Sequence, residues 1–105
     1  MDNMSIRQLA KSLGSSPCFG PMPPVGGDAE PIRRIVTRTE DVGPRDVLLG
    51  ISQQSGAKNE FWEEAYSRGA LGVIAERRLA PWPGCFAIQV DSVKQVLEWI
   101  KQQDL

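Results

Sequence analysis

The sequence predicts a small α/β domain, in which a mostly parallel sheet of about four strands is flanked by about three helices. The length of 105 residues allows one hydrophobic core and excludes two independent domains. Segments with a helical apolar pattern alternate with short extended apolar segments, which is typical of layered α/β domains. A composition of 41% hydrophobic and 24% charged residues, with a formal net charge of -1, is that of a globular protein.

The first predicted element is a helix within residues 1-14. Ser5 and Gln8 have the spacing of a capping box, in which each side chain pairs with a free backbone N–H of the other residue. Gly14 suits the left-handed conformation that ends many helices. Apolar residues recur on one face of this helix: Ile6, Leu9, Ala10 and Leu13.

A loop is expected over residues 15-31, because its many prolines and glycines interrupt periodic structure. Within it, Pro-Met-Pro-Pro at 21-24 is a weak match to proline-rich segments that bind aromatic grooves. A plain connector is the simpler interpretation of this segment.

The α/β core is predicted over residues 32-105. Its four strands are expected at the apolar segments 32-37, 47-51, 71-75 and 86-90. The second of these segments has no polar alternation, so we expect it to be buried on both faces. One further helix is expected between Asn59, as its N-cap, and Gly69. The last helix is expected after a second capping box, formed by Ser92 and Gln95.

The composition excludes several classes of site. The sequence has no histidine, which removes the usual general base near neutral pH and the commonest metal ligand. Cys18 and Cys85 form no zinc or redox motif, and we expect two free thiols, buried or half-buried, in a reducing compartment. The 12 basic and 13 acidic side chains supply no overall field for a phosphate backbone. We therefore expect neither a metal site nor a nucleic-acid partner.

The sequence also bears on localisation. No apolar run approaches the roughly 20 residues that a membrane-spanning helix needs. The first residues lack the basic start and the apolar stretch of a signal peptide. We therefore expect a cytoplasmic protein with no membrane partner.

Polar residues follow the first two predicted strands. Segment 37-41 is Thr-Arg-Thr-Glu-Asp, and segment 52-56 is Ser-Gln-Gln-Ser-Gly. Ligands of α/β domains usually bind where the carboxyl ends of parallel strands meet. Small hydroxyl and amide groups suit a neutral polar ligand such as a base or a sugar, although two solvated turns are an equally simple interpretation. No phosphate loop of the glycine-rich, lysine and hydroxyl type is present, so ATP with Mg²⁺ is not expected to bind in that way.

Aromatic and basic residues offer further candidate contacts. Trp82 and Trp99 could stack on a base, although packing is the commoner role of such residues. Two arginine pairs, at 33-34 and 77-78, could meet a diphosphate if the fold brought them together.

Several motifs occur in an order that resembles a known family. Val42, Pro44 and Asp46 precede the apolar segment 47-51, as in a family pattern of Val, then Pro-Gly-Asp, then a hydrophobic strand. Three further matches follow in order: an aromatic-led helix at 61-65, Gly-Ala and an apolar strand at 69-76, and a strand leading into the last helix at 88-92. Over residues 32-90 the chain resembles the N-terminal domain of the Mur ligases, of the MurE and MurF type.

The resemblance implies a single Mur-ligase N-terminal-like domain over residues 1-105, which binds the UDP-sugar end of UDP-N-acetylmuramoyl-peptide. The whole ligases of this family carry out ATP-dependent amide-bond formation in peptidoglycan synthesis. The implied substrate-binding residues are Thr37, Arg38, Thr39, Gln54 and Ser55, with Arg38 as the partner of the diphosphate.

The resemblance implies no catalytic residue in this chain and no enzymatic activity of the chain alone. ATP and Mg²⁺ are expected only in a central ligase domain, which these 105 residues do not include. That central domain becomes a partner if the chain is a fragment of a longer ligase.

The loops depart from the family pattern. Counting back from Val42, the family's Asp-Ser-Arg falls on 38-40, so that Glu40 replaces an arginine and would repel a diphosphate. The glycine of Pro-Gly-Asp is replaced by Arg45, and the family's Asp-Gly falls on 57-58. These departures support an alternative, a diverged Mur-like domain that has lost nucleotide binding and acts as a protein-interaction module.

Overall fold

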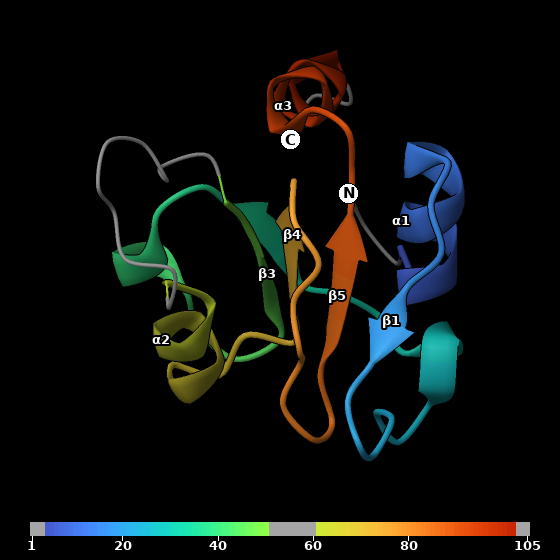
Figure 1. Ribbon diagram of the computed structural model, residues 1–105, viewed down its shortest axis with the longest axis vertical. Coiled ribbons are helices and arrows are strands. Elements are labelled where there is room, and N and C mark those ends of the chain that lie inside the picture. The colour runs from blue at the N-terminus through green and yellow to red at the C-terminus, as the bar shows by residue number, and fades with distance from the viewer. Residues whose placement is uncertain (1–3, 51–60, 103–105) are drawn as a thin grey trace.

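The computed structural model describes residues 4-50 and 61-102. Its helices and strands are α1 (Ile6–Leu13), β1 (Cys18–Phe19), β2 (Arg34–Val36), β3 (Asp46–Leu49), α2 (Phe61–Ser67), β4 (Gly72–Ala75), β5 (Phe86–Gln89) and α3 (Val93–Gln102). Two short 3-10 helices, η1 (Gly27–Ala29) and η2 (Thr39–Asp41), lie in the loops. Figure 1 shows α2 on one side of the central sheet and α1 on the other, with α3 above the strand ends.

The five strands lie in the order β1-β5-β4-β3-β2. Strands β2 to β5 are parallel, and β1 is antiparallel to β5 at the edge of the sheet. The prediction of a small, mostly parallel α/β domain with three helices is therefore confirmed. The sheet has one strand more than predicted, and that strand makes it mixed.

The additional strand lies in the segment 15-31 that was predicted to be a loop. In β1, Cys18 pairs with Ala87, and Phe19 pairs with Phe86. The side chain of Phe19 is partly buried against the core, which holds this short strand on β5. Two residues are too few to show the alternation that marks a strand in a sequence, so the partner strand rather than a local pattern specifies β1.

Helix α1 forms as predicted. The Oγ of Ser5 accepts a hydrogen bond from the backbone N–H of Gln8 at 3.1 Å, and the Oε1 of Gln8 accepts one from the N–H of Ser5 at 3.0 Å. Gly14 has a φ of 70°, and its N–H donates to the carbonyl of Lys11 at 3.1 Å. Ile6 and Leu9 are fully buried on the inner face.

The structure describes some of the residues that were predicted to begin or end the other two helices. Asn59, the expected N-cap of α2, lies outside the described residues. Gly69 follows α2 with a φ of 104°, which glycine adopts without steric cost. At the start of α3, the Oγ of Ser92 accepts a hydrogen bond from the N–H of Gln95 at 3.3 Å, which is one of the two hydrogen bonds of the predicted capping box.

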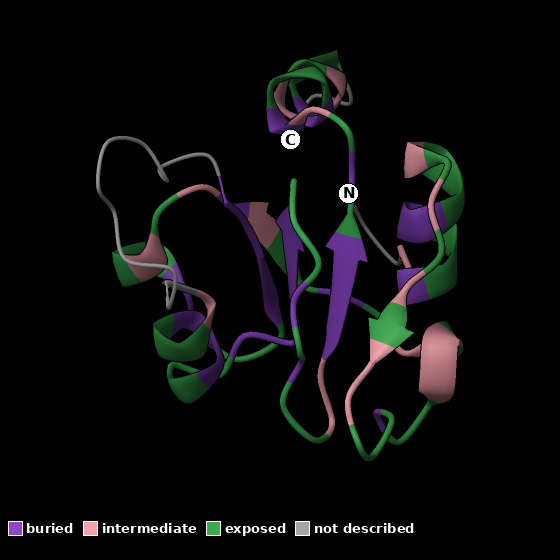
Figure 2. Cartoon of the chain, viewed as in Figure 1, coloured by how far each residue is buried: buried purple, intermediate pink, exposed green. Residues whose placement is uncertain are grey.

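Two apolar clusters lie on opposite faces of the sheet, because successive side chains of a strand point to opposite faces. In β3, Val47 and Leu49 belong to the cluster that includes α1 and α3, whereas Leu48 belongs to the cluster that includes α2. Figure 2 shows the central strands buried along their length. The burial on both faces that was predicted for 47-51 is observed over its described part.

A buried carboxylate begins β3. The side chain of Asp46 is 0% exposed, and its Oδ2 accepts hydrogen bonds from the N–H of Gly43 at 2.8 Å and from the Nε of Arg34 at 3.2 Å. Arg45, at the position where the resembled family has glycine, has a φ of 68°. Its guanidinium pairs with Glu30 at 2.6 Å. The turn therefore keeps a conformation that favours glycine while it holds a different residue.

Candidate functional site

The carboxyl ends of the four parallel strands lie at one edge of the sheet, the upper edge in Figure 1. Three described segments leave the sheet there: 37-41 after β2, 76-78 after β4, and 90-92 after β5. This edge is where ligands of parallel α/β sheets usually bind. The predicted substrate-binding residues follow the two strands β2 and β3.

Two of the predicted residues, Thr37 and Thr39, are half-buried at the end of β2. The turn that holds them is closed by backbone hydrogen bonds, from the N–H of Asp41 to the carbonyl of Arg38 at 3.0 Å and from the N–H of Val42 to the carbonyl of Thr39 at 3.1 Å. Over 4-50 and 61-102, the structure records no hydrogen bond to either threonine hydroxyl. Both hydroxyls are therefore available to a neutral polar ligand.

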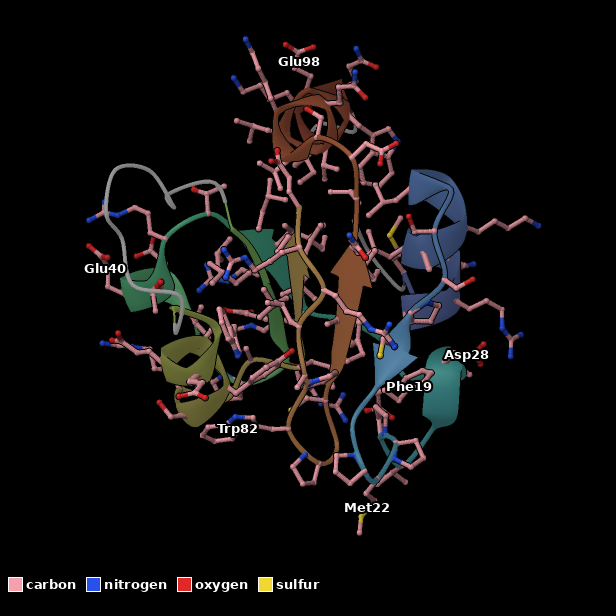
Figure 3. All side chains as sticks on the ribbon, viewed as in Figure 1. Phe19, Met22, Asp28, Glu40, Trp82 and Glu98 are labelled. Atoms are coloured by element: carbon pink, nitrogen blue, oxygen red, sulfur yellow. The ribbon has the colours of Figure 1, made fainter. Side chains whose placement is uncertain are left out.

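Arg38, the predicted diphosphate partner, forms an ion pair with Glu40. Both side chains are largely exposed (Figure 3 labels Glu40). The hydrogen bond from Arg38 lowers the pKa of Glu40, and the same bond raises the pKa of the Arg38 guanidinium. An anionic ligand would have to compete with the Glu40 carboxylate for the guanidinium of Arg38.

Gln54 and Ser55, the remaining predicted contacts, lie outside the described residues. Their place in the site remains a prediction. The neighbouring loop 37-41 is the part of the predicted site that the structure describes.

The two arginine pairs lie at opposite ends of the parallel strands. Arg34 is in register with Asp46 at the first residue of β3, and its guanidinium donates to Asp46 and to the carbonyl of Asp41 at 3.2 Å. The pair 77-78 follows the last residue of β4, at the other edge of the sheet. The fold therefore does not bring the two pairs together on one diphosphate.

A cavity that the sequence did not indicate lies at the carboxyl end of β5. It has a volume of about 410 Å³, and it is lined by residues 12-15, residues 89-92 and three residues of α3, which include Trp99. Trp99 is a residue that, from the sequence alone, could stack on a base. The polar residues 91-92 follow a predicted strand, as 37-41 does, so the same rule applied to the last strand would have pointed to this edge.

Trp82 lies elsewhere, in the loop between β4 and β5. Its ring centroid is 5.9 Å from that of Tyr66, and 39% of the residue is exposed. Burial raises the pKa of the Tyr66 hydroxyl, which donates a hydrogen bond to the carbonyl of Phe86 at 2.7 Å. Trp82 therefore packs on Tyr66 of α2 while part of the residue stays exposed, in keeping with the packing role considered the commoner one.

Both cysteines are free thiols, as predicted. Cys85 is half-buried, and burial raises the pKa of its thiol. Cys18 is exposed, contrary to the expectation of a buried or half-buried thiol, because β1 lies at the edge of the sheet. In the part of the chain that the structure describes, no group of three or more acidic or thiol side chains is placed to share a metal ion. None of the helices described there has the length and apolar character that a bilayer crossing requires.

Comparisons with known proteins bear on the fold. No protein-family model and no curated protein matches the sequence. A crystal structure of MurF from Acinetobacter baumannii is similar to this chain, with a TM-score of 0.64 and 18% sequence identity over 89% of this chain. A structure of UDP-N-acetylmuramoylalanyl-D-glutamyl-2,6-diaminopimelate–D-alanyl-D-alanyl ligase from the same organism has the same TM-score of 0.64, identity of 18% and coverage of 89%. The chain spans 19% of the length of each of these solved chains and has a Mur-ligase-like fold.

Proposed function

We propose that this chain is the N-terminal, nucleotide-recognition domain of a Mur-type ligase, and that it binds the UDP-sugar end of UDP-N-acetylmuramoyl-peptide. The observation that carries the proposal is the pair of free threonine hydroxyls, Thr37 and Thr39, at the carboxyl edge of a sheet with a Mur-ligase-like fold. The parent enzyme would be of the type that adds the third amino acid or the terminal dipeptide in peptidoglycan synthesis.

The described residues support different roles for the two kinds of side chain in this turn. Thr37 and Thr39 are neutral and half-buried, so their hydroxyls suit the uncharged base and ribose. Arg38 is the cation nearest to them in the chain and would pair with the diphosphate once Glu40 is displaced. Gln54 and Ser55 complete the proposed set from the loop after β3.

No residue of the chain is proposed to be catalytic. The role of the domain is to hold the nucleotide end while a central domain, which would bind ATP and Mg²⁺, activates the peptide carboxylate for attack by an amine. A cytoplasmic location is proposed for the same protein, and its two free thiols are in keeping with a reducing compartment.

Titration of the ¹⁵N-labelled protein with UDP-N-acetylmuramic acid, followed by NMR, tests the proposal. We expect amide shifts concentrated at residues 37-40, equal shifts there with UMP, and none with a plain sugar. Thr39→Ala should weaken binding roughly 2- to 13-fold, which corresponds to about 0.5–1.5 kcal/mol for one neutral hydrogen bond. Ser16→Ala, which removes an exposed hydroxyl before β1, is the matched control and should leave the affinity unchanged.

A flat titration at millimolar nucleotide would overturn the proposal. Unchanged affinity in Thr39→Ala, with shifts still present at 37-40, would remove Thr39 from the site and leave the nucleotide site in place.

A second candidate function, a protein-interaction module, is favoured by the opposite end of the molecule. Met22, Val25 and Trp82 are 63%, 105% and 39% exposed. Figure 3 shows Met22 and Trp82 at the lower end, far from α3, and the N–H of Gly84 donates to the carbonyl of Met22. Large apolar side chains exposed on adjoining loops are typical of protein-binding surfaces. If the domain has this second function, it should bind no nucleotide even when Glu40 is replaced by glutamine.

A further inference from the structure

The cavity at the end of β5, which we name the β5 groove, is a second candidate binding site. Its lining residues come from the end of α1 and the residues after it, the end of β5 and the start of α3. Its volume of about 410 Å³ is within the range of small-molecule sites. Strands β4 and β3 separate β5 from β2. Because adjacent strands lie about 4.8 Å apart, the β5 groove is roughly 14 Å from the threonines after β2.

Hydrogen bonds between distant parts of the chain hold the walls of the β5 groove. The Oγ of Ser15 donates to the carbonyl of Gln89 at 2.9 Å, which ties the end of α1 to the end of β5. The Oε2 of Glu76, after β4, accepts from the N–H of Val93 at 3.0 Å, which fixes the first turn of α3. The groove is therefore formed before a ligand arrives, and binding costs little ordering of the protein.

The polar groups of the β5 groove are mostly uncharged. Its hydroxyl, amide and carboxylate side chains are Ser12, Ser15, Gln89, Asp91, Ser92 and Gln95. Hydroxyl and amide groups both donate and accept hydrogen bonds, and a carboxylate accepts them from hydroxyls. A ligand with several hydroxyl groups matches this mixed set.

Trp99 is the one aromatic residue among the described lining of the β5 groove, beside the aliphatic Leu13, Val90 and Val96. The side chain is partly buried and packs against the apolar cluster of α1 and α3, while the same residue lines the groove. A flat ring fixed in this way presents an apolar surface beside polar groups. Such a pairing suits a saccharide ring, which has an apolar C–H face and hydroxyl groups around its edge.

The charged side chains that line the β5 groove favour a neutral ligand over an anion. No lysine or arginine is among the described residues that line it, and Asp91 is acidic. A second carboxylate, that of Glu76 after β4, accepts a hydrogen bond from the N–H of Val93 in the first turn of α3, next to the lining residue Ser92. A phosphate placed here would lie near two carboxylates, with no cationic side chain among the described lining residues.

We propose that the β5 groove binds an uncharged, hydroxyl-rich ring of the saccharide class. This site is independent of the nucleotide site proposed at residues 37-40, since it uses other strands and other chemistry. The sugar can be free or linked to a nucleotide, and both sources share the ring that the groove recognises.

The indole N–H signals of ¹⁵N-labelled tryptophan test the proposal on the whole chain. N-acetylglucosamine should shift the signal of Trp99 and leave that of Trp82 unchanged, because Trp82 lies at the opposite end of the molecule (Figure 3). UDP-N-acetylglucosamine should shift Trp99 as well, whereas UMP should not. Gln95→Ala should weaken the binding of N-acetylglucosamine at least about threefold, as expected for one lost hydrogen bond. Gln102→Ala, an exposed glutamine at the other end of α3, is the matched control.

Each outcome separates this proposal from the proposed function. With UDP-N-acetylglucosamine, shifts at 37-40 and a silent Trp99 would overturn the saccharide site and leave the nucleotide site standing. A response of Trp99 to free sugar, with residues 37-40 silent to UMP and to UDP-N-acetylmuramic acid, would support the groove and count against the nucleotide site. A Trp99 shift with UMP equal to that with the sugars, or equal weakening in Gln95→Ala and Gln102→Ala, would overturn the groove proposal.

Discussion

Glu40 is the acidic side chain that an anionic group would meet at the turn after β2. Its carboxylate forms an ion pair with the guanidinium of Arg38, the predicted diphosphate partner. The family that the sequence resembles has an arginine at this position, so the same turn in this chain carries the opposite charge. A nucleotide bound as proposed would reach the hydroxyls of Thr37 and Thr39, whereas its phosphates would meet an acidic side chain.

Glu40→Gln should tighten the binding of UMP several-fold at low ionic strength, because it removes the repulsion and releases Arg38. The gain should shrink as added salt screens these exposed charges. Uridine, which has no phosphate, should bind equally to both proteins. NMR titrations with UMP and with uridine at two salt concentrations measure the difference.

Glu98→Gln is the control for this substitution, since Glu98 is an exposed acid on α3 (Figure 3). Equal changes in UMP and uridine affinity, or no change in either, would show that Glu40 does not govern access of the phosphate.

At the level of the elements, β4 and β5 fit together through one glycine. Gly72 of β4 is in register with Phe86 of β5, and a Cβ added at Gly72 would lie 2.3 Å from the ring of Phe86. The fully buried ring thus occupies the space above the glycine and fills the core beneath α1. Because the core is close-packed, the ring of Phe86 fits only where its neighbour in β4 has no side chain.

Gly72→Ala should therefore lower the free energy of unfolding by about 1–3 kcal/mol, the usual cost of overpacking a core. The same change in a Phe86→Leu background should cost less, because the smaller side chain leaves room for the added methyl group. Urea denaturation of the four proteins of this double-mutant cycle measures the coupling.

Gly43→Ala serves as the comparison, since a Cβ at Gly43 would make contacts no closer than 3.5 Å. A cost for Gly72→Ala that is as small as the cost for Gly43→Ala would contradict this account of the β4-β5 contact.

At the level of the whole molecule, ion pairs fasten loops to the layered core. Arg7 of α1 binds Asp28 of η1 at 2.7 Å, across 21 residues of sequence. This hydrogen bond lowers the pKa of Asp28, as the bond from Arg38 lowers the pKa of Glu40. Both carboxylates are exposed, so each pair adds only modestly to stability.

The sign of these shifts predicts an acid-sensitive fold. A carboxyl group whose pKa is lowered by folding stabilises the protein above its unfolded pKa, which is about 4, and this contribution is lost as the pH falls through the folded pKa. The urea midpoint should therefore fall below about pH 4, and Asp28→Asn should make the decline shallower. Midpoints measured from pH 6 to pH 3 test this, and an identical slope in Asp28→Asn would contradict it.

The sequence alone predicted the elements that are formed by interactions between residues close together in the chain. The capping box of Ser5 and Gln8, the buried face of α1 and the apolar strand β3 all depend on residues a few positions apart. Their hydrogen bonds and side-chain faces follow from periodicity, so pattern alone predicts them. The mostly parallel sheet followed from the order of these elements along the chain.

Other features depend on which strands become neighbours. Edge strand β1 forms where Phe19 pairs with Phe86 of β5. One wall of the β5 groove forms where Ser15 donates a hydrogen bond to Gln89, 74 residues away. The separation of the two arginine pairs likewise follows from the parallel register of β2 to β4. Such contacts join residues that no short pattern links, because the free energy that selects them comes from burying the whole sheet between its helices.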